Sequence, residues 1–307
     1  MKHFLSIEDL GQENFREIWI KALTIAKRAE HRRPLEGKFV GIYFRGTSTR
    51  TRTAFTVGAL RLGAQVINYG PNDLQLNTGE TVLDTGRVLS GFLDVLVVRT
   101  NDALAEMKAL AEQNQMSIIN AMSQNEHPTQ AIGDLVTIHE AFGHLEDVHV
   151  LYLGEGNNTT AALALAIAHI PGMRLTVVTP EGYGLPTSLL EKANKLAARS
   201  GAVIEQHHGI NRLPTAVDVV YTTRWQTMGV PKADGEWRTK FAPYCVTPAV
   251  MARVSNPSRT IFLHDLPAIR GSEVLDEVLD GSQSLAFRQA QHKLTSAMAI
   301  LEWCAAN

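Results

Sequence analysis

The sequence has little cysteine, little excess charge and no long apolar run, and each shortage excludes a class of protein. Cys245 and Cys304 are the only cysteines among 307 residues, too few for the disulfide framework of a small secreted domain. The 29 basic residues nearly balance the 31 acidic ones, so the chain lacks the basic excess of a nucleic-acid or membrane-surface protein. No apolar stretch reaches the roughly 18 residues of a membrane helix, and the first residues lack the apolar core of a signal peptide. These absences predict a cytoplasmic protein that acts on a small molecule, with no nucleic-acid or membrane partner.

Apolar residues make up 45% of the chain, and they fall into two kinds of segment that alternate. Short β-rich runs are followed by helical patterns of about 10–15 residues, an order that predicts βαβ units and parallel sheets. The runs predicted as strands are 38–44, 65–69, 94–99, 117–121, 148–154, 174–180, 202–206, 218–223 and 260–267. The patterns predicted as helices are 8–29, 49–63, 103–113, 128–143, 159–170, 187–200 and 285–305.

We therefore predict an α/β protein with two doubly wound parallel-sheet domains. Residues 1–143 form the first domain and residues 144–284 the second, because a new strand begins after a helix near this break. Residues 285–307 form a late amphipathic helix with no strand after it, which we expect to pack back on the first domain. Ligands of such sheets bind at the carboxyl ends of the strands, so the residues at those ends are the candidates for a site.

The segment FRGTSTRTRTAF, residues 44–55, places hydroxyls and guanidiniums where a strand gives way to a helix. Ser48 is expected to cap the helix, and Thr49, Arg50, Thr51 and Arg52 form its first turn. A helix N-terminus favours an anion, and hydroxyls with guanidiniums suit a multiply charged, tetrahedral one such as phosphate. The alternative is an ordinary capped helix with a solvated basic first turn.

A second segment, QNEHPTQAIGDL, places a histidine at the mouth of the same sheet. His127 precedes Pro128, a residue type favoured at the first helical position, and Gln130 follows one turn later on the same side. An imidazole can donate to a carbonyl oxygen and a carboxamide can accept from an NH₂ group. The pair therefore suits an amide-like ligand, and the alternative is a histidine with a purely structural role.

Polar residues end two further strands. Arg99 closes the third run, where its guanidinium could bridge a phosphate and a carbonyl oxygen; the alternative is a surface arginine. His264 and Asp265 come at the end of the last run, followed by Leu266 and Pro267. Because the proline restricts Leu266 to extended geometry, we expect the Leu266 carbonyl to point outward rather than into a helix.

Together these segments resemble the aspartate/ornithine carbamoyltransferase family, over nearly the whole chain and closer to the ornithine branch. FRGTSTRTRTAF is similar to the family's carbamoyl-phosphate loop, HPTQ to its carbamoyl-binding motif, and HDLPAIRGSEV to a segment of the ornithine branch. The resemblance implies a carbamoyl-phosphate domain followed by an amino-acid domain. It also implies homotrimers, or multiples of trimers, in which neighbouring subunits share each active site.

The resemblance gives each matching residue of the first motifs a role. Thr49, Arg99 and His127 would polarise the carbamoyl carbonyl, and Gln130 would hold its NH₂ group. The residues that would bind carbamoyl phosphate are Ser48, Thr49, Arg50, Thr51, Gln75, Arg99, His127, Gln130, Leu266 and Lys293.

Two positions of the first domain and one of the last helix depend on the resemblance alone. Gln75 lies in the segment 74–89, which is similar to a loop that a neighbouring subunit inserts into the site. Lys293 stands where the ornithine branch has an arginine. It keeps the positive charge but lacks the planar guanidinium that can donate two parallel hydrogen bonds. Thr78 stands where the aspartate branch has a catalytic lysine.

The acceptor site departs from both branches of the family. Asn158, with help from Asn157, would contact the amino acid in a segment similar to the GDGNN of ornithine enzymes. Thr223 replaces the aspartate that binds the α-ammonium there, while Arg224 matches an arginine that takes a substrate carboxylate in aspartate enzymes. Asp265 replaces a cysteine, so an ammonium can still be matched. The residues that would bind the amino acid are Asn158, Thr223, Arg224, Thr227, Met228 and Asp265.

Two alternatives stay open in the second domain. Arg224 could be neutralised by Asp265 or Glu273 and touch no substrate. Gly154 and Gly156, which follow a strand, could belong to a dinucleotide loop, although the third glycine and the acidic ribose ligand are missing.

We expect an enzyme that transfers the carbamoyl group of carbamoyl phosphate to the amine of an amino acid, giving a ureido amino acid and phosphate. Ornithine or a related diamino acid is the expected acceptor; the alternatives are aspartate, another amine of specialised metabolism, or a non-catalytic anion-binding role. The catalytic residues would be Thr49, Arg99, His127 and Asp265, with Asp265 or the departing phosphate accepting the amine proton. No cofactor is expected, and no metal, since no His/Cys/Asp cluster has ligand spacing.

Overall fold

The computed structural model describes residues 1–27, 33–226, 231–256 and 258–306 and divides the chain into two compact units. Unit 1 comprises Met1–Val136 with Gln291–Asn307, and unit 2 comprises Thr137–Ala290. The divisions fall inside helix α5 (Pro128–Phe142) and helix α11 (Ala286–Ala305), so each of these helices contributes to both units. Each unit is built on one parallel sheet.

The sheet of unit 1 has the strand order β2-β1-β3-β4, with every neighbour parallel. The strands are β1 (Phe39–Phe44), β2 (Gln65–Tyr69), β3 (Val95–Arg99) and β4 (Ser117–Met122). β3 and β4 are buried along their whole length, as expected of parallel strands covered on both faces. The register pairs Phe44 with Arg99 and Arg99 with Met122. The carboxyl ends of β1, β3 and β4 therefore lie level with one another.

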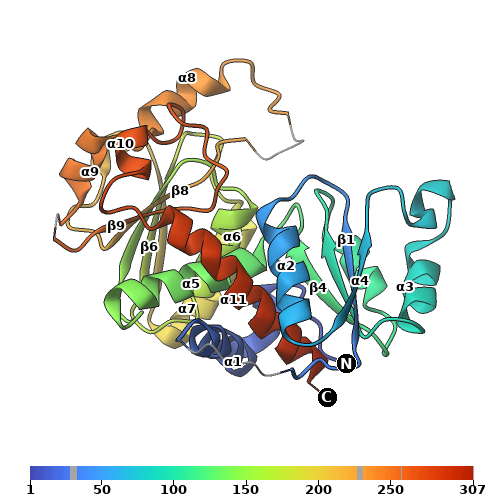
Figure 1. Cartoon of the computed structure of the whole chain (residues 1–307). Helices are drawn as coiled ribbons and strands as arrows, with labels where there is room; N and C mark the ends of the chain where they lie inside the picture. Colours follow the sequence, from blue (N-terminus) through green and yellow to red (C-terminus); the bar gives the residue numbers. More distant parts are fainter. Residues whose placement is uncertain (28–32, 227–230, 257, 307) are drawn as a thin grey trace. The chain divides into compact units, whose positions relative to one another are not determined.

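The last part of the chain packs on unit 1, as the sequence predicts. Met298 of α11 lies so close to Gly58 that an added Cβ there would be 3.1 Å from the Met298 Cγ, and Figure 1 shows α11 (red) alongside α2. The Ser117 hydroxyl donates to the Cys304 carbonyl over 3.0 Å. The other helices of this unit are α1 (Ile7–Lys27), α2 (Arg50–Arg61), η1 (Gln75–Thr78), α3 (Val82–Ser90) and α4 (Ala105–Leu110).

The sheet of unit 2 has the order β7-β6-β5-β8-β9, again with parallel neighbours. The strands are β5 (His149–Leu153), β6 (Arg174–Thr179), β7 (Val203–His208), β8 (Val219–Thr222) and β9 (Ile261–His264). The register pairs Thr222 with both Leu153 and His264. The segments that follow β5, β8 and β9 thus leave the sheet at one level.

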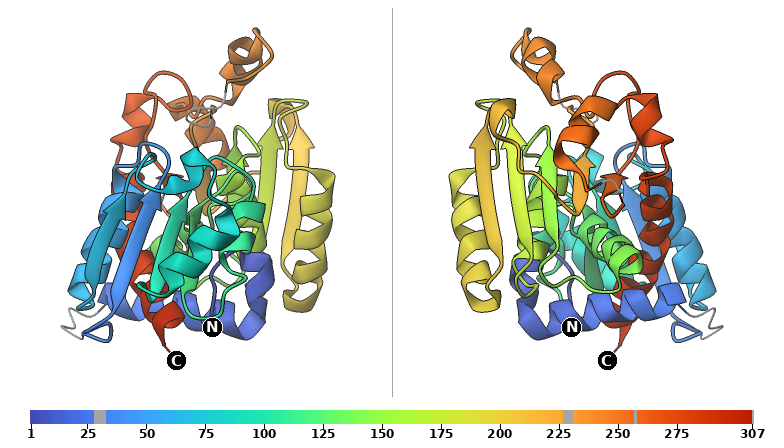
Figure 2. Two further views of the ribbon diagram at one scale, coloured as in Figure 1. Left: turned by 90° about the vertical axis from the view of Figure 1, so that its right-hand side faces the viewer. Right: turned by 90° about the vertical axis from the view of Figure 1, so that its left-hand side faces the viewer.

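Helices cover this second sheet. Every residue of α6 (Asn158–Ile167) is buried, whereas α7 (Thr187–Ser200) buries only Ala193 and Ala197 and lies along the β7 edge in Figure 2, in yellow. The remaining helices are η2 (Ile210–Arg212), α8 (Trp237–Phe241), η3 (Ala242–Tyr244), α9 (Pro248–Val254) and α10 (Asp276–Leu279). In the part of the chain that the structure describes, none of the helices has both the length and the apolar character needed to cross a bilayer.

Each sheet contains a point at which the order of strands reverses. In unit 1 the chain moves from β1 to β2 on one side and then to β3 on the other; in unit 2 it moves from β5 to β6 and β7, and then to β8. Open α/β sheets bind their ligands at the carboxyl ends of the strands beside such a point. Candidate sites are therefore expected after β1 and β3 in unit 1, and after β5 and β8 in unit 2.

The predicted fold class, strands and long helices are confirmed, and two local expectations are wrong. Helix α2 begins at Arg50 with Thr49 as its N-cap, one residue later than expected for a Ser48 cap, because the Thr49 carbonyl accepts the Thr53 N–H. Leu266 is not extended: its φ is 54° and the Leu266–Pro267 bond is cis. The steric rule used above applies to a trans bond, where the proline Cδ faces the preceding residue.

Candidate functional site

Three level strand ends in unit 1 place Arg99, and the segments that carry Thr51 and His127, at one edge of the sheet. Arg99 is the last residue of β3, is buried, and donates from Nη1 to the Thr51 hydroxyl of α2 over 3.1 Å. His127 immediately precedes α5, which begins at Pro128 as predicted. The structure therefore joins the segment after β1 to the end of β3 by a direct hydrogen bond.

His127 is the electrostatic centre of this edge. Its side chain is buried, with Nδ1 3.3 Å from the Thr129 hydroxyl. Burial lowers the pKa of His127 well below its usual value, and the positive charges of Lys293, Arg99 and Arg50 lower it further. The imidazole is consequently neutral at neutral pH, with one nitrogen as donor and the other as acceptor. Three cations around a neutral donor form an environment suited to an anion that also has a carbonyl oxygen.

Gln130 is held at both ends of its carboxamide. Its Nε2 donates to the buried Asp134 carboxylate over 2.6 Å, and its Oε1 accepts from the Lys293 ammonium of α11. The oxygen expected to accept from a substrate NH₂ group thus already has one donor. A carbonyl oxygen has two lone pairs, so a second donor can be accommodated.

The first turn of α2 separates its two arginines. Arg50, at the helix N-terminus, lies near enough to His127 to affect the His127 pKa. Arg52 instead turns back on β1: its guanidinium lies 5.3 Å from the centre of the Phe44 ring, and Nη2 donates to the Phe44 carbonyl over 3.4 Å. Of the two, only Arg50 is placed with the predicted phosphate residues.

Gln75 stands apart from these residues. It begins η1, is exposed, and accepts from the Thr78 hydroxyl over 2.6 Å. Among the described residues, its hydrogen bonds are with Thr78 and do not lead to another predicted carbamoyl-phosphate residue. The single chain does not bring Gln75 into the cluster.

In unit 2, Asn157 and Asn158 have different surroundings. Asn157 is the N-cap of α6, and its Oδ1 accepts from the backbone N–H groups of Thr159 and Thr160. Asn158 is the first residue of the helix and is buried. Asn157 is thus committed to capping, which leaves Asn158 as the candidate for contact with an amino acid.

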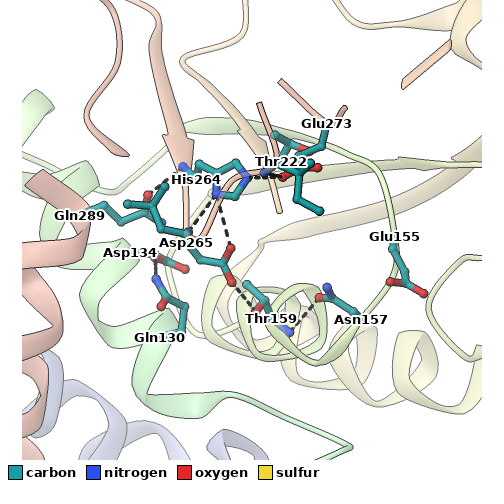
Figure 3. Close-up of polar contacts among 12 residues, drawn as sticks. Gln130, Asp134, Glu155, Asn157, Thr159, Thr222, His264, Asp265, Glu273 and Gln289 are labelled. Atoms are coloured by element: carbon teal, nitrogen blue, oxygen red, sulfur yellow. Dashed lines mark hydrogen bonds and ion pairs between the residues drawn. The ribbon is translucent and has the colours of Figure 1, made fainter. Parts of the chain in front are cut away.

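Asp265 is bound to the same helix, as Figure 3 shows. Its Oδ2 accepts from the Thr159 hydroxyl over 2.9 Å, and its Oδ1 lies 3.7 Å from Nδ1 of His264. The same Nδ1 accepts from the Leu266 N–H over 2.8 Å, and Nε2 of His264 lies 3.4 Å from Glu273. Sequence reasoning missed Thr159, although a threonine beside Asn158 in the first turn of a helix was a visible signal.

Arg224 forms no ion pair with Asp265 or Glu273 among the described residues. Its Nε is buried and finds no hydrogen-bond partner in that part of the chain. The side chain borders a cavity of about 350 Å³, which Trp225, Trp237 and Glu273 also line. Thr223, one residue earlier, is buried. Thr227 and Met228 lie outside the described residues.

Among the residues that the structure describes, no group of three or more His, Cys, Asp or Glu side chains is arranged to hold a metal ion. Unit 1 offers three cations and a neutral hydrogen-bond donor, groups suited to an anion. Unit 2 offers a carboxylate, an amide and a guanidinium for a small polar molecule.

Two family models match nearly the whole chain. Residues 2–140 match the model described as aspartate/ornithine carbamoyltransferase, carbamoyl-P binding domain. Residues 146–304 match the model described as aspartate/ornithine carbamoyltransferase, Asp/Orn binding domain. The two matches follow each other in the order that the motifs predict.

Similar proteins and structures agree with these matches. An ornithine carbamoyltransferase from Anoxybacillus flavithermus is 36% identical over 303 residues, covering 98% of this chain and 95% of that protein. One from Symbiobacterium thermophilum is 39% identical over 306 residues, covering 98% and 96%. The solved ornithine carbamoyltransferase from Pyrococcus furiosus is 34% identical with a TM-score of 0.91, covering 98% of this chain and 96% of that one. The chain therefore belongs to the aspartate/ornithine carbamoyltransferase family, in its ornithine carbamoyltransferase branch, and is a carbamoyltransferase.

Proposed function

We propose that the enzyme transfers the carbamoyl group of carbamoyl phosphate to the amine of ornithine or a related diamino acid. The amine nitrogen forms a bond to the carbamoyl carbon, and the bond from that carbon to the phosphate oxygen breaks. The products are a ureido amino acid and phosphate, and the amine gives up one proton. The relatives named ornithine carbamoyltransferase support this class of acceptor.

The main support from the structure is the neutral His127 among Arg50, Arg99 and Lys293. The cations balance the charge of a phosphate, while a neutral imidazole can donate to the carbonyl without adding another charge. As the amine attacks, negative charge develops on the carbamoyl oxygen. Donors already fixed in a buried site stabilise that charge without reorganising, which is the largest single contribution in many acyl transfers. His127, Arg99 and Thr49 are the proposed donors.

We assign the phosphate to Ser48, Thr49, Arg50, Thr51 and Lys293, and the carbamoyl NH₂ group to Gln130 and the Leu266 carbonyl. No Asp or Glu occurs among residues 45–55, so the start of α2 keeps its attraction for an anion. Asp265 or the departing phosphate accepts the amine proton.

The charges of unit 2 support an acceptor with both an ammonium and a carboxylate. Asp265 offers a negative charge for the ammonium. Arg224 offers a positive charge for the carboxylate, and Asn158 adds a polar amide. The buried Arg224 Nε without a hydrogen-bond partner favours a role in ligand binding over neutralisation by a neighbour, because an unsatisfied buried donor costs free energy. The same feature keeps aspartate, or another amine with a carboxylate, as the second candidate acceptor.

We further propose that the enzyme works as a homotrimer, or a multiple of trimers, with shared active sites. Gln75 is exposed, and the surface around α3 and β2 is rich in exposed apolar side chains: Ile67, Leu83, Val88 and Phe92, the last 70% exposed. Exposed apolar patches of this kind mark association surfaces. A neighbouring subunit seated there would receive the Gln75 of this chain beside its own phosphate residues, and in a closed ring of three the other neighbour would supply its Gln75 to this chain. The free cysteines fit a reducing cytoplasm.

Phosphate release from carbamoyl phosphate, measured across a panel of amines, tests the proposal directly. The panel should contain ornithine, shorter diamino acids, aspartate and a simple monoamine. We expect release only with an amino acid, and a ureido product of matching mass. Binding of carbamoyl phosphate without release for any amine would favour the non-catalytic alternative.

A further inference from the structure

A second charged pair in unit 2 lies outside all the residues assigned so far. Lys232 donates to Oε1 of Glu155, and the two side chains are only 9% and 18% exposed. Glu155 belongs to the loop between β5 and α6, the loop that ends at Asn157 and Asn158. Lys232 lies in the segment that leads to α8. The pair therefore ties two separate segments of unit 2 together.

Aromatic rings enclose the Lys232 ammonium on its other sides. The nitrogen lies 4.8 Å from the centre of the Tyr183 ring, 5.0 Å from that of Phe241 and 5.6 Å from that of Trp237. These rings also pack on one another, with Tyr183 and Trp237 both edge-on to Phe241. Ring faces attract a cation, so one carboxylate and three rings replace much of the water that an ammonium normally binds.

The loop that Glu155 belongs to is closely packed. The Glu155 carbonyl accepts from the Tyr152 hydroxyl over 2.8 Å and from the Thr160 hydroxyl over 2.9 Å. A Cβ added at Gly156 would lie 2.3 Å from the backbone nitrogen of Leu185. The backbone is thus fixed on both sides of Asn157. The Glu155 side chain connects this loop to the segment that contains Lys232.

Stability alone does not account for this pair. Taking two charges out of water costs free energy that their attraction often fails to recover. Burial raises the pKa of Glu155 although Lys232 opposes the shift, and the second carboxylate oxygen is buried without a hydrogen-bond partner among the described residues. Replacing a buried ion pair by apolar residues of similar volume is often neutral or stabilising. The pair is therefore better explained by a role in holding the Glu155 loop and the Lys232 segment in one arrangement than by a contribution to stability.

We propose that Lys232 and Glu155 are positioning residues for the amino-acid acceptor. Through Glu155, the pair fixes the loop that presents Asn158; through Lys232 and its ring contacts, it fixes Trp237, which lines the cavity beside Arg224. Neither residue contacts the substrate in this proposal. The inference rests on the proposed function only in naming the acceptor as the ligand affected; the fixing of the loop stands independently of it.

The kinetic test compares Lys232→Met with Lys240→Met. Lys240 lies in α8, directly after that segment, and pairs with Asp234 over 2.8 Å, but its side chain is 53% exposed, so it is a matched control. A displacement of about 1 Å in a positioning group can cost on the order of 100-fold in rate. We expect Lys232→Met to raise the acceptor KM about tenfold, with the KM for carbamoyl phosphate changed less than about twofold. Lys240→Met should change neither.

A second variant separates positioning from loss of folding. Glu155→Gln keeps an oxygen for Lys232 while removing the charge, and should give a smaller rise in the acceptor KM. The double variant Lys232→Met/Glu155→Gln should be no worse than Lys232→Met alone, because the two residues act as one unit. A lower Tm with unchanged KM values for both substrates would show a structural role and overturn the proposal.

Hydrogen exchange tests the same idea without any reaction. Backbone amides of 154–160 should exchange several-fold faster in Lys232→Met than in the parent or in Lys240→Met. Unchanged exchange there would overturn the proposal even if activity fell. Faster exchange in a protein that carbamoylates none of the amines tested would keep the positioning role and reject only the proposed function.

Discussion

Arg50 and Arg52 are two positions apart in α2, yet their guanidiniums have different surroundings. Arg52 packs on the Phe44 ring and carbonyl, whereas Arg50 belongs with the cations near His127. Arg50→Ala should weaken carbamoyl phosphate binding by roughly 2–4 kcal/mol, the range for a buried, charge-assisted contact. Titration calorimetry measures this directly, and Arg52→Ala should show a much smaller loss of affinity. Equal affinities for Arg50→Ala and the parent would remove Arg50 from the site.

His127 gives a prediction about pH. Its pKa is lowered well below 6.5. At pH 6.5 nearly all His127 side chains are therefore in the neutral, donating form, and they become protonated only at lower pH. A plot of kcat against pH should therefore show no fall near pH 6.5 that is caused by His127. The profiles of the parent and of His127→Asn should have the same shape in that region. His127→Ala should lower kcat by about 100-fold or more, as for loss of an oxyanion donor, and a chelator should have no effect. An acidic limb at pH 6.5 in the parent, absent from the variant, would mean that His127 acts as a titrating base.

Arg224 and Asp265 give a prediction about the acceptor. Arg224→Val should raise the acceptor KM about tenfold or more, because a buried charged partner left unmatched costs at least 1–3 kcal/mol. Carbamoyl phosphate binding should stay nearly unchanged. Thr223→Asp with Arg224→Val and Asp265→Cys should move the ranking of acceptors toward ornithine, if ornithine is not already the best. An identical ranking of ornithine, aspartate and shorter diamino acids in parent and triple variant would show that these positions do not set specificity.

At the scale of elements, the start of α1 and the loop before α5 are joined through a buried carboxyl. Glu126 accepts from the Ser6 hydroxyl over 2.5 Å and from the Ile7 N–H over 2.9 Å, and burial raises its pKa from 4.5 to about 7. Between these two values the folded protein keeps a proton that the unfolded chain has lost. Its free energy of unfolding should therefore fall as pH rises from about 4.5 to 7 and level off above.

Glu126→Gln removes this titration while keeping an oxygen and a donor for the same partners. At about 1.4 kcal/mol per pKa unit, the parent should lose on the order of 3 kcal/mol across the window relative to the variant. Urea unfolding at a series of pH values measures the difference, with the exposed Glu13→Gln as control. Parallel pH profiles for Glu126→Gln and the parent would contradict the assignment.

The elements themselves were largely predictable, because runs such as that of β3 are apolar throughout and lie between regular helical patterns. The short helices α3, α8, α9 and α10 were not, since tertiary packing rather than a long apolar face stabilises them. The same limit applies within the site. Spacing could place His127 beside Pro128, but it could not show that Arg52 turns away, that Asp265 binds Thr159, or that Lys232 meets Glu155 across 77 residues. Spacing also does not reveal the positive φ of Leu266.

At the scale of the whole molecule, the proposed shared site of a homotrimer predicts complementation between inactive subunits. Arg50→Ala and Gln75→Ala each remove one contributor, and each homotrimer should be inactive or nearly so. After reversible dissociation and mixing, some hybrid sites would contain an intact Arg50 from one subunit and an intact Gln75 from another. Phosphate release should then recover in part. A fully active monomer by sedimentation would exclude the shared site.

The position of α11 also has a consequence for how the protein is made. Lys293, Met298 and Cys304 are synthesised after every strand of both sheets, yet they complete unit 1, whose own sheet is synthesised early. Domains generally fold in the order of their synthesis, but here the first unit cannot be completed until after the second has emerged. The nascent chain must hold an unfinished first half, with the places of Met298 and Cys304 empty, while the second half folds. A premature stop codon at or before Lys293 would thus remove a residue of the proposed phosphate site, although the other residues of that site are synthesised long before it.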